Sequence, residues 1–210
     1  MLTAFTASLL LITVSELGDK TFFIAAILAM RHARRWVFVG AVLALALMTL
    51  LSVLVGQAAA FLPDPVLKGA EVCLFLFFGL KLLYQASQMP AVRQHTEAQA
   101  AAEVVEKAEQ TQTQPQKGTT ALAIVVEALS LVFVAEWGDR TQIATIALAA
   151  ANPPAGVILG AVLGHSICAA IAVICGRWVC GWLSERTLIG LGGGLFLLFA
   201  ILELSTVSVG

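Results

Sequence analysis

The chain has 210 residues, of which 60% are hydrophobic and only 12% are charged. Soluble domains use charged residues at about a quarter of their positions, so this composition excludes an ordinary soluble domain and indicates a protein surrounded by membrane lipid. The formal net charge of −1 provides no basic surface for a phosphate backbone, which excludes a nucleic-acid partner.

The apolar residues form stretches long enough to cross a membrane, for which about 20 residues suffice. Six stretches follow one another: 3–30, 36–61, 66–87, 119–150, 154–176 and 187–207. We therefore expect an all-α membrane protein with six transmembrane helices. The first stretch has no basic residues before it and no small-residue cleavage site, so we interpret it as a mature helix and not as a signal peptide.

Residues 88–118 separate the third and fourth stretches and are rich in Gln, Glu, Ala and Thr. Such a segment lacks the apolar surface needed to pack, so we interpret it as a solvated linker, and its composition is compatible with a helix from Ala98 to Glu109. Basic residues gather in this linker and in the connections after the first and fifth stretches. The positive-inside rule then predicts a cytoplasmic linker, with both termini outside.

Residues 1–87 and 119–210 repeat each other at a constant offset. Glu136 follows Glu16 by 120 residues, and the tetrapeptide GlyAlaValLeu at 40–43 recurs at 160–163. Because each half holds three spans, the second half must enter the membrane in the opposite sense to the first. Two inverted three-helix repeats are typical of secondary transporters, whose site lies where the repeats meet near the bilayer midplane.

Two charged motifs interrupt the first and fourth apolar stretches. The first reads SerGluLeuGlyAspLysThr at 15–21, and the second reads AlaGluTrpGlyAspArgThr at 135–141. One charged residue at the centre of a membrane helix costs about 2.5–3.5 kcal/mol on insertion scales. Six charged residues in these two positions therefore indicate a functional requirement, and not a packing device.

The acidic residues of the motifs are candidate ligands of a metal ion. Glu16 and Asp19 are three residues apart, as are Glu136 and Asp139, so each pair would share one face of a continuous helix. Carboxylate oxygens suit hard divalent cations such as Ca²⁺, Mg²⁺ and Mn²⁺, and neither motif contains the Cys or His that Zn²⁺ or Cu⁺ would favour. We predict that these four residues bind a divalent cation.

The remaining motif residues are expected to tune the charge or geometry of the site: Gly18, Gly138, Lys20, Arg140, Thr21 and Thr141. Each basic residue follows its Glu by four positions, the favoured spacing for an ion pair within a helix. Each threonine either supplies a hydroxyl ligand or bonds to the preceding turn. Each glycine either lets helices approach closely or lets the helix open and present carbonyl groups.

Polar residues outside the motifs are secondary candidates. His165 is expected to form a satisfied polar pair with Ser166 in the core more than to act as a ligand or a proton carrier. Gln57 and Gln142 lie near the expected pathway, and the sequence does not set the direction of their side chains. Glu127 precedes Glu136 by nine residues and either lines a cytoplasmic vestibule or, as we favour, lies at the membrane interface. Three more charged residues fall toward span ends and are expected either to extend to the lipid headgroups or to hold helices together at that level: Glu71, Lys81 and Glu203.

Charge balance supports a hypothesis of metal/proton exchange. The four carboxylates and two basic residues of the motifs sum to a charge of −2, which one divalent cation or two protons would neutralise. An empty site would therefore have to take up protons before it could recross the membrane.

The paired Glu-X-Gly-Asp-(Lys/Arg)-Thr motifs in six spans resemble those of the manganese/calcium cation:proton antiporter family. That family includes bacterial manganese exporters, a thylakoid manganese transporter and a Golgi manganese/calcium transporter. The resemblance covers essentially the whole chain and implies Mn²⁺ or Ca²⁺ as the substrate, with no separate cofactor. The absence of a long N-terminal targeting segment is similar to the bacterial members, which implies Mn²⁺ efflux across a bacterial inner membrane.

Two other functions stay open at this point. An intramembrane aspartyl protease also needs two aspartates, but Asp19 and Asp139 each have a glutamate at −3 and a basic residue at +1, which favours a cation site. An exporter of small organic cations or amino acids would need an apolar or aromatic substrate pocket. Within the transporter class, Mn²⁺ and Ca²⁺ both accept oxygen ligands, and the sequence sets neither this choice nor the oligomeric state.

Overall fold

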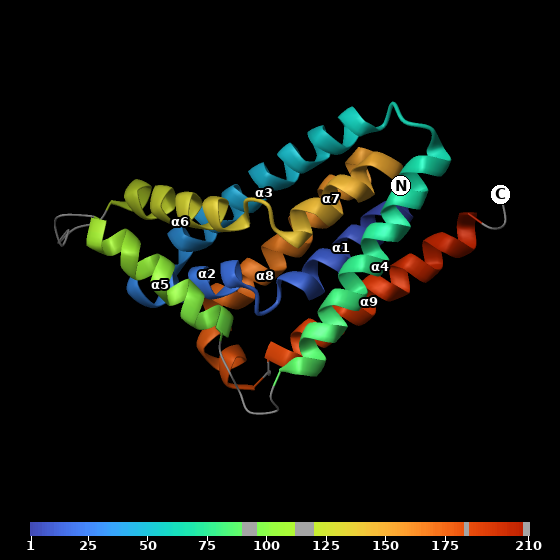
Figure 1. The fold of residues 1–210 in the computed structure, drawn as a ribbon. Helices are drawn as coiled ribbons and strands as arrows, with labels where there is room; N and C mark the ends of the chain where they lie inside the picture. Colours follow the sequence, from blue (N-terminus) through green and yellow to red (C-terminus); the bar gives the residue numbers. More distant parts are fainter. Residues whose placement is uncertain (90–95, 112–119, 183–184, 208–210) are drawn as a thin grey trace.

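The computed structural model describes residues 1–89, 96–111, 120–182 and 185–207. Within these ranges the protein consists of nine α-helices and no β-strand, which confirms the predicted all-α class (Figure 1). The helices in chain order are α1 (Leu2–Glu16), α2 (Lys20–Arg31), α3 (Arg34–Ala59), α4 (Asp64–Gln88), α5 (Thr96–Thr111), α6 (Ala121–Glu136), α7 (Arg140–Ala151), α8 (Pro154–Trp182) and α9 (Glu185–Val207).

Several of these helices suit a membrane by length and composition. Three helices in the described part of the chain are long and apolar enough to cross a bilayer: α3, residues Pro154–Ile174 of α8 and residues Arg186–Ser205 of α9. Helices α6 and α7, taken together as one broken span, would make a fourth. Exposed leucines such as Leu43, Leu47 and Leu54 lie along one side of α3, where they can face lipid. The protein is therefore a membrane protein, and the arrangement of six spans stays a prediction.

The first and fourth predicted spans are not continuous helices. The chain leaves the helical conformation after Glu16 and again after Glu136, and the axes of α6 and α7 differ by 75°. Gly18 and Gly138 have φ values of 78° and 82°, in the left-handed region that other residues rarely adopt. The helix opening predicted for these glycines is therefore observed at both, and Gly18 also lies against Leu188 of α9, where a side chain would not fit. The expectation that Glu and Asp share one helical face was wrong, because the break separates them.

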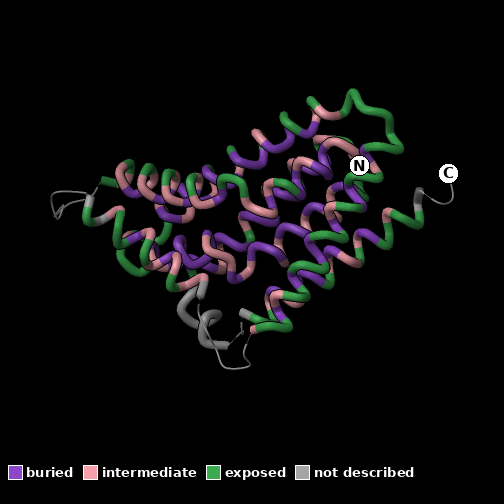
Figure 2. Tube along the Cα trace, viewed as in Figure 1, coloured by how far each residue is buried: buried purple, intermediate pink, exposed green. Residues whose placement is uncertain are grey.

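The helices of the two halves pack in corresponding pairs. Helix α1 packs along α8, just as α6 packs along α3, and α4 packs against α9 (Figure 1). Buried residues concentrate between these helices, whereas the outer surfaces are exposed (Figure 2). Gly40 lies in the contact of α3 with α6, and Gly160 lies in the contact of α8 with α1. The glycines at 40 and 160 thus occupy corresponding contacts in the two halves.

Replacing Gly40 with alanine is expected to lower the free energy of unfolding by about 1–3 kcal/mol, the usual cost of overpacking. A methyl group there would lie 2.5 Å from the carbonyl oxygen of Val125 and 2.8 Å from Cβ of Ala128. Thermal unfolding in detergent measures the effect, with Gly69→Ala as the control because no atom lies within 4 Å of its new methyl group. Equal midpoints for the two variants would show that α3 and α6 do not pack this closely.

Part of the predicted linker is a packed helix. Helix α5 lies against α2, and both Ala101 and Val105 are fully buried in that contact (Figure 1). The expectation that residues 88–118 cannot pack was therefore wrong for α5, because two apolar residues four positions apart provide a narrow buried stripe. Residues 90–95 and 112–119 of that segment lie outside the described part of the chain.

Candidate cation site

The two helix breaks bring three carboxylates together. Glu16 is the last residue of α1 and Glu136 is the last residue of α6, and each side chain is only 2% exposed. One oxygen from each of Glu16, Glu136 and Asp139 lies within 4.8 Å of the other two. The C-terminal ends of α1 and α6 carry partial negative charge from their free carbonyl groups. The N-terminal end of α7, which Asp139 caps, carries partial positive charge, so the formal charge of the three carboxylates is what favours a cation.

Threonine hydroxyl groups hold these carboxylates. The Thr21 hydroxyl donates to Oε2 of Glu16 at 3.1 Å and also lies 3.4 Å from Oε1 of Glu136, so it links the two halves. In the other motif, the Thr141 hydroxyl donates to Oδ2 of Asp139 at 3.1 Å. Among the described residues, Oε1 of Glu16 is buried and has no hydrogen-bond partner. A buried oxygen without a partner is available to a bound ion or a proton.

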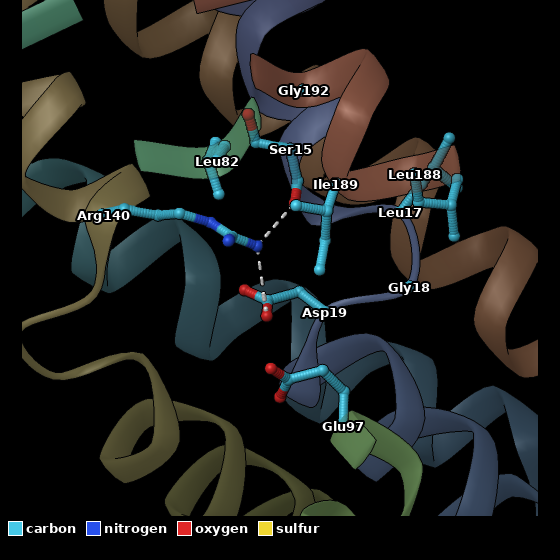
Figure 3. A pocket seen from close by; sticks show the side chains of 10 residues that line it. All are labelled: Ser15, Leu17, Gly18, Asp19, Leu82, Glu97, Arg140, Leu188, Ile189 and Gly192. Carbon is cyan, nitrogen blue, oxygen red and sulfur yellow. Dashed lines mark hydrogen bonds and ion pairs between the residues drawn. The ribbon is translucent and has the colours of Figure 1, made fainter. Parts of the chain in front are cut away.

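Asp19 is held apart from this cluster by Arg140. Nη2 of Arg140 lies 3.3 Å from Oδ1 of Asp19 and 3.4 Å from the carbonyl oxygen of Ser15, as Figure 3 shows. The predicted pairing of Arg140 with Glu136 was wrong, because the break places Arg140 on α7 and Glu136 on α6. Arg140 instead reaches from the second half of the chain to the first.

Lys20 differs from its counterpart Arg140. It begins α2, and within the described residues it forms no ion pair, so the predicted pairing with Glu16 was also wrong. Its side chain lines a cavity beside the carboxylates. The two motifs are therefore alike in sequence and unlike in the contacts of their basic residues.

Gln142 and Gln57 stabilise α7 and are not among the clustered carboxylates. The backbone N–H of Gly138 donates to Oε1 of Gln142 at 2.7 Å, while Nε2 of Gln142 donates to Sδ of Met48 at 3.0 Å. This pair of contacts fixes the break and joins it to α3. Nε2 of Gln57 donates to the carbonyl oxygen of Ala149 at 2.6 Å, which joins α3 to the end of α7.

His165 and Glu127 lie away from the carboxylate cluster. His165 is buried on α8, and its Nδ1 has no hydrogen-bond partner among the described residues. The expectation of a satisfied pair with Ser166 was therefore wrong, because the Ser166 hydroxyl donates to the carbonyl oxygen of Val162 at 2.7 Å. Oε2 of Glu127 lies 3.5 Å from Nε2 of His32, which follows the end of α2. Neither residue lines the cavity beside the carboxylates. The structure therefore does not bring these two secondary candidates into the site.

A cavity of about 500 Å³ opens beside the site. Its wall includes Glu136 and Asp139 on one side, and Lys81 and Gln85 of α4 with Glu97 of α5 on the other. Lys81, which was predicted to lie toward the end of its span, therefore also lines this cavity. Glu97 was not predicted to approach the site. The signal that could have placed Glu97 here is the spacing of Ala101 and Val105, which docks α5 onto α2.

The bundle of apolar helices, together with buried carboxylates at two helix breaks, defines a membrane protein that handles cations. The chain matches the family described as "Divalent cation/proton antiporter GDT1" over residues 4–90 and 124–208. It therefore belongs to the GDT1 family of divalent cation/proton antiporters. Members of this family are transporters and not enzymes, which rejects the aspartyl protease alternative.

Curated relatives agree with this family over nearly the whole chain. "GDT1-like protein sll0615" of Synechocystis is 57% identical over 203 residues, which cover 97% of each chain. "Protein PAM71-homolog, chloroplastic" of Arabidopsis thaliana is 41% identical over 93% of this chain and 57% of its own length. "GDT1-like protein 3" of Oryza sativa is 43% identical over 93% of this chain and 71% of its own. No solved structure matches the chain.

Proposed function

We propose that this antiporter exports Mn²⁺ in exchange for protons, with Glu16, Asp19, Glu136 and Asp139 as the cation ligands. The observation that carries the proposal is the approach of three of these carboxylates to within 4.8 Å across the two halves of the chain. Hard divalent cations bind such oxygens, and the hydroxyl of Thr21 lies beside two of them. Manganese as the substrate rests on the family resemblance of the motifs.

The proposed topology places the site between two inverted repeats, residues 1–87 and 119–210, in a bacterial inner membrane. The corresponding packing of α1 on α8 and of α6 on α3 supports this arrangement. The termini would face outward and residues 88–118 would face the cytoplasm, because α5 packs against α2, which ends at Arg31 and leads into the basic start of α3 (Figure 1). The cavity lined by Glu97 and Gln85 then opens the site toward the cytoplasm.

Exchange follows from competition for the same oxygens. Mn²⁺ entering the cavity would neutralise the excess charge of the carboxylates and allow one repeat to move against the other. Protons from the outer side would then occupy the carboxylate oxygens and release the metal, because a protonated carboxyl group is a poor ligand. Arg140 would balance the negative charge of Asp19 while the metal is absent, because its guanidinium group forms an ion pair with Oδ1 of that carboxylate.

Uptake into proteoliposomes that contain a pH-sensitive dye tests this function. The expected result is that added Mn²⁺ enters while protons leave, and that an imposed pH gradient alone drives Mn²⁺ movement. Ca²⁺ in place of Mn²⁺ tests the alternative of a Ca²⁺/proton antiporter, since the faster ion identifies the substrate. Organic cations and amino acids should not compete. Metal movement without proton movement would contradict the exchange mechanism.

A further inference from the structure

A second cavity lies at the opposite end of the helix bundle from the first. It has a volume of about 490 Å³ and is bounded by residues of α1, α4, α7 and α9. The start of α1, the end of α9 and the connection between α3 and α4 are at this end (Figure 1). In the proposed topology this cavity is therefore on the outer side, where an exported cation would leave.

The cavity contains a buried carboxylate that the candidate site does not use. Glu71 on α4 is only 2% exposed, so of the two roles predicted for it the side chain does not extend outward but lies between helices. Nδ2 of Asn152 donates to Oε1 of Glu71 at 3.3 Å, while Oε2 is buried without a partner among the described residues. A buried acceptor without a partner loses hydration and gains nothing in return. This oxygen is therefore available to a ligand.

The other polar groups of the cavity favour a cation. Glu203 of α9 and Lys68, one turn before Glu71, line the same cavity. Two carboxylates and one ammonium group leave a charge of −1, and Asn152 adds an amide oxygen. Carboxylate and amide oxygens suit a hard divalent cation.

One face of α4 connects the two cavities. Glu71, Phe75, Phe78 and Leu82 are all buried at helical spacing on this face. Phe75 lines the outer cavity, whereas Phe78 lines the cavity beside the carboxylates. The rings of Phe75 and Phe78 each lie 5.8 Å from the ring of Phe196. These three aromatic rings pack between the two cavities and keep them separate.

We propose that Glu71, with Glu203 and Asn152, forms a second divalent-cation site that receives the cation after it passes the aromatic rings. The proposal rests on the proposed function for the identity of the cation and the direction of its movement. The binding of a divalent cation at Glu71 does not require that the central carboxylates bind one.

Counting bound Mn²⁺ by electron paramagnetic resonance of the free ion tests this proposal in detergent-solubilised protein. The unmodified protein should bind two ions, Glu71→Gln one, the double variant Glu16→Gln/Glu136→Gln one, and the combination none. Glu103→Gln removes an exposed carboxylate from α5 and should still bind two. Two ions bound by Glu71→Gln would overturn the second site and leave the proposed function intact. Two ions bound by the double variant would instead overturn the central site.

A second variant keeps the test valid should Glu71→Gln fail to fold. Asn152→Asp adds a carboxylate beside Glu71, and ligand charge raises the affinity of oxygen sites for divalent cations. One of the two Mn²⁺ sites should then bind roughly tenfold more tightly. Unchanged affinity at both sites in Asn152→Asp would overturn the proposal.

Discussion

Glu136→Gln is expected to reduce Mn²⁺ transport by at least about 100-fold, because even residues that only support metal ligands cost 10–100-fold when replaced. The substitution keeps the size of the side chain and removes one of three carboxylates that lie within 4.8 Å of one another. An amide retains one oxygen but loses the charge that balances a divalent cation. Initial rates of Mn²⁺ uptake into proteoliposomes measure the loss.

Glu16→Gln is the matched variant in the other half of the chain. Glu16 and Glu136 are equally buried and lie near the same hydroxyl group of Thr21, so both variants should lose transport to a similar extent. Glu127→Gln serves as the control, because Glu127 pairs with His32 and lies outside the carboxylate cluster. Near-normal rates in either Glu16→Gln or Glu136→Gln would show that the cluster is not the transport site.

Arg140→Gln is expected to lower the free energy of unfolding by about 3–5 kcal/mol, the usual cost of removing one partner from a buried ion pair. Arg140 lies 3.3 Å from Asp19, and both side chains are largely shielded from solvent. Without Arg140, the Asp19 carboxylate would have to keep its charge in a largely buried position without its guanidinium partner. Thermal unfolding of the purified protein in detergent measures the destabilisation.

The double variant Arg140→Gln/Asp19→Asn separates this ion pair from a general packing effect. Removing both partners should restore most of the lost stability, because no uncompensated charge is left behind. Lys20→Gln provides the matched control at the corresponding position of the first motif, because Lys20 forms no ion pair with any described residue. Equal destabilisation by Lys20→Gln and Arg140→Gln would contradict the assigned pairing, as would additive losses in the double variant.

The helical class and the candidate carboxylates could be predicted from the sequence, because both depend on local composition and on motif spacing. The helix breaks could not be predicted with certainty. A glycine within an apolar stretch serves close packing, as at Gly40, or a left-handed turn, as at Gly18. Sequence spacing is the same for both roles, and only the surrounding structure decides between them.

The meeting of the two motifs was predicted from the repeat, but other contacts between distant segments were not. The spacing rule for helical ion pairs predicted that Arg140 contacts Glu136, but the rule fails once the chain changes direction between the two residues. Glu71 was expected to reach the headgroups or to hold helices together, and its enclosure by α7 and α9 fits only the second role. A helix from Ala98 to Glu109 was compatible with the composition, but its packing on α2 was not predicted, because Ala101 and Val105 are a minor feature of a polar segment.

Anomalous X-ray scattering from crystals grown with Mn²⁺ would show directly where the cation binds. We expect an anomalous peak between the carboxylates of Glu16, Glu136 and Asp139, at the junction of the two helix breaks. That peak should be absent from crystals of Glu136→Gln. A fully ordered carboxylate cluster with no anomalous peak at saturating Mn²⁺ would contradict the account and show that these residues serve another role.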